Sequence, residues 1–129
     1  MKTRGISPAA RLLTTLGILC ALPAAAQAEG EAAKGREIAV NHCARCHVIP
    51  DFNPYGGINS TPSFRLLAKR DDYLERLQSF YARPPHPVFV RVPGVPAPTG
   101  EPAFVAPIEV SPEQIDDLIA FVEAIRAQQ

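Results

Sequence analysis

Sulfur-containing residues and tryptophan are scarce in this chain. Its 129 residues include no tryptophan, three cysteines and one methionine, which is Met1. Beyond Met1, therefore, no thioether side chain can act as a ligand. Cysteines at positions 20, 43 and 46 cannot build the set of disulfides that stabilises many small secreted domains. At most, Cys43 and Cys46 could pair with each other.

An excess of one charge and a long hydrophobic run are also missing. The chain has 13 basic and 13 acidic residues and no formal net charge at pH 7. This balance does not suggest a nucleic-acid-binding protein. The apolar stretch at residues 12–22 is too short to be a good membrane span, which takes about 20 residues. The sequence shows neither internal repeats nor strong strand signals.

The first 28 residues have the features of a secretory signal peptide. Basic side chains precede the apolar stretch, and Ala26-Gln27-Ala28 forms a small-x-small cleavage site. We therefore expect residues 1–28 to be removed, leaving a mature domain of residues 29–129 in the periplasm. That domain would carry ten basic and 13 acidic residues. A signal that is not cleaved would instead anchor the chain in the membrane.

The first half of the mature chain carries signals for two helices. Residues 31–46 read as one helix, although Gly35 costs about 1 kcal/mol relative to alanine. A glycine inside a helix often marks the close approach of another element. Thr61 followed by Pro62 is typical of a helix start and predicts a short helix that ends near Ala68.

Two further helices are predicted nearer the C-terminus. Asp71 or Asp72 is expected to cap one that stops before Pro84, with its apolar residues at helical spacing. Those residues are Tyr73, Leu74, Leu77, Phe80 and Tyr81. Ser111 and Gln114 form a capping box for the last helix. Its apolar stripe comprises Ile115, Leu118, Ile119, Phe121, Val122 and Ile125.

Prolines dominate residues 84–107, which hold eight of them. This density forbids a helix and argues against a central strand. Because the segment is also rich in valine, we expect a long ordered loop rather than a disordered linker. The predicted class is therefore all-α, with about four helices and long loops.

The motif Cys43-Ala44-Arg45-Cys46-His47 is the most specific signal in the chain. Its C-x-x-C-H spacing is the attachment signature of c-type haem. Two cysteines three residues apart on a helical turn face the same way and can form thioethers to the two porphyrin vinyl groups. The adjacent histidine can then bind the iron. The motif therefore predicts one covalent haem c, held by Cys43, Cys46 and His47.

Two other chemistries share parts of this motif. A thioredoxin-like dithiol would need a preceding strand and a βαβ pattern, and neither is visible. A zinc site would need a second pair of ligands at suitable spacing, for which only His42 and His86 are candidates. His42 adjoins Cys43, and we expect it to be a partly exposed helical residue.

The order of these elements resembles a class I monohaem cytochrome c over nearly the whole mature chain. Residues 31–36, Glu-Ala-Ala-Lys-Gly-Arg, resemble the N-terminal helix of that family. Ile119-Ala120-Phe121-Val122 resembles the segment that packs against its glycine. The resemblance implies a cytochrome c-like fold around one covalent haem, with Gly35 and Phe121 at a crossing of the first and last helices.

A second segment of the resemblance concerns the surroundings of His47. Thr61-Pro62-Ser63-Phe64 resembles the glycine-proline-x-leucine segment of the family. By this likeness, the Pro62 carbonyl accepts a hydrogen bond from His47 and orients its ring. Phe64 would pack on the haem edge.

The chain departs from the family at the sixth iron ligand. Residues 77–89 resemble the stretch that ends in proline-histidine-x-x-methionine, and the methionine position falls on Phe89. His86 is the only imidazole outside the attachment helix. Three possibilities remain open: His86 binds the iron, the sixth position is open or holds water, or another ligand fills it.

These features predict a periplasmic one-electron carrier that works with a redox partner protein. Electron transfer makes no bonds, so the protein needs no catalytic residues and we expect it not to be an enzyme. One alternative is a haem protein whose open distal site binds a small molecule such as nitric oxide or carbon monoxide. Another is an electron-transfer subunit or dedicated partner of a dehydrogenase or oxidase, which would dock through residues 84–107.

Overall fold

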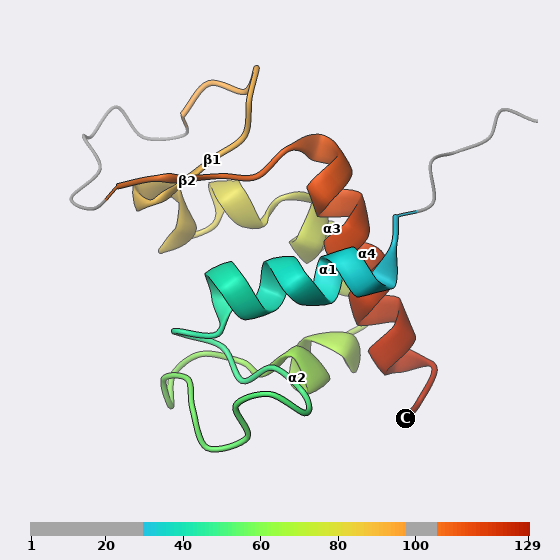
Figure 1. The fold of residues 1–129 in the computed structure, drawn as a ribbon. Coiled ribbons are helices and arrows are strands. Elements are labelled where there is room, and N and C mark those ends of the chain that lie inside the picture. Colours follow the sequence, from blue (N-terminus) through green and yellow to red (C-terminus); the bar gives the residue numbers. More distant parts are fainter. Residues whose placement is uncertain (1–29, 98–105) are drawn as a thin grey trace, which may run out of the picture.

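The computed structural model describes residues 30–97 and 106–129. The predicted signal peptide, residues 1–28, lies outside the described residues, and so does part of the proline-rich segment. Within them, helix α1 (Ala32–Ile38) crosses the long terminal helix α4 (Pro112–Arg126), as Figure 1 shows. Two shorter helices, α2 (Phe64–Ala68) and α3 (Tyr73–Gln78), also pack on α4. The all-α class is confirmed. No described helix has the length and apolarity needed to cross a membrane.

Close packing at the α1–α4 crossing depends on glycine. A Cβ placed on Gly35 would overlap the carbonyl oxygen of Asp117 and lie 2.9 Å from Cβ of Phe121. The predicted crossing is therefore confirmed, although its tightest contact is with the Asp117 backbone. The Asp117 carboxylate also accepts a 2.6 Å hydrogen bond from the backbone N–H of Glu31.

The helix predicted for residues 31–46 ends earlier than expected. After α1 the chain continues as a π-helical turn, η1 (Ala39–Cys43). After η1, the N–H groups of Cys46 and His47 both bond to the carbonyl of Cys43, at 3.0 and 2.8 Å, and close the turn that carries the motif. Wide turns like η1 are frequent at functional sites.

The start predicted at Thr61 and Pro62 for the second helix is wrong. Helix α2 begins at Phe64, and Ser63 is its cap, with the hydroxyl accepting from Leu66 N–H at 3.1 Å. The Phe64 N–H, which has no helical acceptor, bonds to the carbonyl of Val48 at 3.0 Å.

Helix α3 is shorter than the apolar spacing predicts. It ends at Gln78, and a 3₁₀ turn, η2 (Phe80–Ala82), follows. The 3.6-residue period therefore fails after Gln78. Leu77 is buried as expected, but the side chain of Leu74 points outward and is 40% exposed. By contrast, the capping box of Ser111 and Gln114 at the start of α4 is confirmed.

The proline-rich segment contains a short strand pair that the sequence did not predict. A 3₁₀ turn, η3 (His86–Val88), leads into β1 (Val90–Arg91). This strand pairs in parallel with β2 (Ile108–Glu109), with Val90 opposite Ile108. A second hydrophobic cluster forms beneath the pair, made of Val90, Val92, Val110 and Ile115. The pair anchors the end of the turn that carries His86.

Candidate cofactor site

A cavity of about 460 Å³ lies between the attachment loop, residues 43–47, and the segment that runs from α3 to η3. Cofactor pockets usually have volumes of ~300–1,000 Å³ and mainly apolar walls. Here the apolar wall includes Phe64, Leu67, Leu77, Phe80, Phe89 and Leu118. The cavity therefore has the size and lining of a cofactor site.

Both cysteines of the motif line this cavity and are free thiols. Burial raises the pKa of Cys43 to about 12, with a smaller contribution from Cys46 nearby. Redox-active cysteines need the opposite, a lowered pKa. In residues 30–97 and 106–129 there is also no group of three His, Cys, Asp or Glu side chains that could hold a metal ion. These observations favour neither the dithiol nor the zinc interpretation.

His47 is held by its imidazole as well as by its backbone. Its Nδ1 lies 2.7 Å from the carbonyl oxygen of Pro62, so Nδ1–H is the donor. Phe64 lies edge-on to the ring, with centroids 5.7 Å apart. Burial lowers the pKa of His47, and the bond to Pro62 opposes this in part. The neutral ring therefore has a free Nε2 lone pair. The Pro62 carbonyl thus accepts from His47 as the family resemblance implied, and Phe64 lines the cavity.

His86 is held in the same manner on the other side of the cavity. Its Nδ1 lies 3.0 Å from the carbonyl oxygen of Arg83, which again makes Nδ1–H the donor. Phe80 and Phe89 contact the ring edge-to-face, with centroids 5.3 and 5.9 Å from that of His86. Burial lowers the pKa of His86. The Nε2 atom of this imidazole therefore also has a free lone pair.

The imidazoles of His47 and His86 face the same space. Their planes are within 9° of parallel, and their centroids lie 6.1 Å apart. Residues 39 positions apart in the sequence are thereby brought together. His42, in contrast, is exposed and lies at the edge of the cavity, as expected for a residue on the attachment helix.

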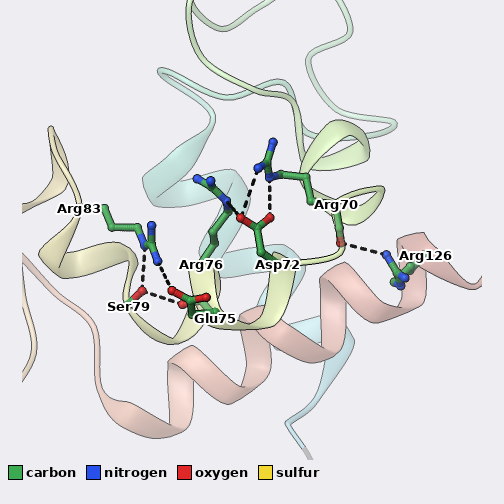
Figure 2. Close-up of polar contacts among 7 residues, drawn as sticks. All are labelled: Arg70, Asp72, Glu75, Arg76, Ser79, Arg83 and Arg126. Carbon is green, nitrogen blue, oxygen red and sulfur yellow. Dashed lines mark hydrogen bonds and ion pairs between the residues drawn. The ribbon is translucent and has the colours of Figure 1, made fainter.

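Two arginines supply the positive charge of the cavity wall. Arg76 of α3 and Arg83 both line it, and no aspartate or glutamate among the described residues does so. Arg76 pairs with Asp72 at 2.8 Å, and Arg83, which follows η2, pairs with Glu75 at 2.8 Å (Figure 2). The sequence did not single out Arg76. The spacing of Asp72 and Arg76 signals an ion pair on a helix, not a place in a cavity.

A model of the cytochrome c family matches residues 32–126. This chain belongs to the cytochrome c family. The matched range contains the attachment motif, His86 and all four described α-helices. Membership means a covalently bound haem c and haem-based electron transfer. Searches of curated proteins and of solved structures found no match.

The residues that line the cavity of this cytochrome c fit a haem. Its wall is mainly apolar, and Cys43, Cys46 and His47 of the attachment motif lie on it together with His86. Metal-binding histidines also usually donate their second N–H to a carbonyl or carboxylate, as both rings do here.

Proposed function

We propose that this cytochrome c is an exported one-electron carrier with one haem, attached through Cys43 and Cys46. His47 is its proximal ligand and His86 its sixth ligand. The parallel pair of imidazoles across the cavity is the observation that carries this proposal. The bound haem supplies the chemistry, because its iron alternates between the ferric and ferrous states.

On the proximal side, Pro62 and Phe64 orient His47. The 2.7 Å bond to the Pro62 carbonyl holds the ring plane and makes Nε2 more basic. Phe64, which is 3% exposed, excludes water from the edge of the ring. Burial favours the neutral imidazole, and the bond to Pro62 makes that imidazole a stronger ligand.

On the distal side, His86 fits better than an open position. Its ring is fixed by the Arg83 carbonyl and by two aromatic contacts, so little reorganisation is needed for binding. Two imidazoles, with no methionine, give a lower reduction potential than histidine–methionine ligation. We therefore place this protein in the low-potential range of its family, as a variant of the class I type.

Arg76 and Arg83 fit the two carboxylates of the porphyrin. An arginine has five N–H donors, and Arg76 uses only its Nε toward Asp72. Donors therefore remain on the wall of the cavity for the haem propionates. These residues bind and orient, and no residue of the site has to move a proton or attack a substrate, which agrees with a carrier rather than an enzyme.

Export through residues 1–28 would place the protein in the periplasm, where haem c is exposed to soluble or membrane-bound redox partners. A dehydrogenase, an oxidase or another cytochrome would be a suitable partner. The proposal also covers a role as the dedicated electron-transfer subunit of such a dehydrogenase or oxidase. N-terminal sequencing of the purified protein tests the export step. A first residue of Glu29 is expected, whereas Met1 would contradict cleavage.

Optical spectra test the ligand assignment directly. We expect the wild-type ferric protein to be low-spin and the ferrous protein not to bind carbon monoxide. His86→Ala should turn the ferric spectrum high-spin and admit carbon monoxide, while His42→Ala, the matched control, should change neither. A high-spin wild type that binds carbon monoxide would point instead to an open site for a small ligand. A low-spin spectrum that survives His86→Ala would show that another group is the sixth ligand.

A further inference from the structure

Asn53 makes three hydrogen bonds to the backbone around the attachment motif. Its Oδ1 accepts from the N–H of Ile49 at 2.6 Å. Its Nδ2 donates to the carbonyl oxygens of Ala44 at 2.9 Å and of His47 at 3.0 Å. Among the described residues, no other side chain donates to a carbonyl of residues 43–48.

These bonds leave the Asn53 amide one orientation. A primary amide has two N–H donors and one carbonyl oxygen, and all are used here. A flipped amide would place its oxygen against two carbonyl oxygens and its NH₂ against an N–H group. Aspartate has the same shape but no donor, and leucine has a similar shape with neither donor nor acceptor.

The bonds reach the two places where the motif must be held. Ala44 lies between the two cysteines, so a hydrogen bond to its carbonyl holds the loop that carries both sulfurs. The other bond holds the main chain of His47, whose ring is separately held by Pro62. Two other loop carbonyls are bound by backbone groups: that of Cys46 by Ile58 N–H at 2.9 Å and that of Val48 by Phe64 N–H at 3.0 Å.

The loop is shaped to bring Asn53 back to the motif. Asp51 adopts a left-handed conformation, with φ of 57°, which reverses the chain after Ile49. Gly57, with φ of 79°, then passes close to the same loop, since a Cβ there would lie 3.1 Å from the Cys46 carbonyl. The side chain of Asn53 thus fills the space between the reversed segment and the motif.

We propose that Asn53 is a positioning residue for the haem site. It fixes the carbonyls of Ala44 and His47 and thereby the direction from which His47 presents its imidazole. This inference rests on the proposed function, because it assumes that His47 binds the iron. All three hydrogen bonds of the Asn53 side chain go to backbone groups, so it acts through the backbone.

The test compares substitutions at Asn53 with the same substitutions at Asn59. Asn53→Leu removes all three bonds without adding charge, and Asn53→Asp removes the two donors and adds a charge. Asn59 is the matched control. It is an exposed residue of the same loop, and its side chain forms no hydrogen bond with any described residue. The readouts are the hyperfine-shifted haem methyl resonances of the ferric protein, which depend on the direction of the axial imidazole planes, and the reduction potential.

We expect both Asn53 variants to displace the haem methyl resonances and the potential, and both Asn59 variants to match the wild type. Wild-type resonances in the Asn53 variants, or equal displacement in the Asn59 variants, would overturn the assignment. If the Leu and Asp variants yield no haem protein, Asn53→Gln keeps the amide one methylene further out. Displaced resonances in that loaded variant support the proposal, and unchanged ones overturn it. A wild type that fails to stain for covalent haem would refute the proposed function itself, independently of Asn53.

Discussion

Asp72 lies between two arginines at the start of α3. Its carboxylate pairs with Arg70 at 2.7 Å and with Arg76 at 2.8 Å, as Figure 2 shows. It occupies the N-cap position of α3, yet its side chain makes no capping bond. The arginines therefore determine its orientation. Through Arg76, the same carboxylate helps to place one of the basic groups of the cavity wall.

The Asp72 pairs predict a dependence of stability on acid. The hydrogen bond from Arg70, and then that from Arg76, lowers the pKa of Asp72 from 3.8 to about 2. Because the folded-state pKa is the lower one, the stabilisation is complete above pH 3.8 and is lost as the pH falls toward 2. Asp72→Asn should reduce the loss of stability between these pH values, measured by urea unfolding at a series of pH values.

Asp71→Asn is the control for Asp72→Asn, because Asp71 is an exposed neighbour that forms no ion pair with any described residue. It should keep the wild-type acid profile. Equal acid profiles for wild type and Asp72→Asn would show that the pairs contribute nothing measurable, as many exposed ion pairs do.

At the scale of elements, the crossing of α1 and α4 sets the position of the attachment loop. Helix α1 runs directly into η1 and Cys43, so any movement of α1 against α4 moves the cysteines. Hydrophobic contacts reinforce the crossing, since Ile38, Ala39 and Val122 belong to one buried cluster. The absence of a side chain at Gly35 allows the two backbones to come close enough for these contacts.

Gly35→Val should separate the two helices. The added side chain would overlap the Asp117 carbonyl, and overpacking of this kind costs about 1–3 kcal/mol. For a domain of this size the melting temperature should fall by roughly 5–20 °C, measured by circular dichroism. Ala33→Val, at an exposed position of the same helix, controls for the lower helix propensity of valine. Equal melting temperatures for the two variants would contradict the close crossing.

At the scale of the whole molecule, the cavity lies where two hydrophobic clusters meet. One cluster is built around α1, α2 and α4, and the other around β1 and β2. Phe80 and Ile119 pack against both. A cavity of about 460 Å³ between them leaves much of the interior without contacts unless it is filled. The haem therefore completes the core as well as supplying the redox centre.

The double variant Cys43→Ser/Cys46→Ser should not fold stably, because it cannot retain haem covalently. Without haem the apolar wall of the cavity would face water, and a small protein has only ~5–15 kcal/mol of folding free energy to offset that loss. Circular dichroism should show reduced helix content and no cooperative melting. Cys20→Ser, which changes a cysteine in the predicted signal peptide, should leave the mature protein unaffected. Wild-type melting of the double variant would show that haem is not needed for the fold.

Local sequence patterns were sufficient for several features of this protein. Three of them are the C-x-x-C-H motif, the capping box at Ser111 and the close approach at Gly35. Each depends on a few residues whose spacing or size has one physical explanation. The amphipathic stripe of α4 is equally local, because burial follows the helical period over 15 residues. The class of the fold and the cofactor could therefore be derived before any contact was known.

Only the tertiary structure decided how the site is assembled. That His86 faces His47 depends on the path of the chain through η2, η3 and the β1–β2 pair, and no spacing between adjacent residues specifies that path. Asn53 and Arg76 belong to the site for the same reason. Each is determined by a bond or a wall supplied by residues elsewhere in the chain, whereas sequence patterns report mainly on neighbours along the helix or turn.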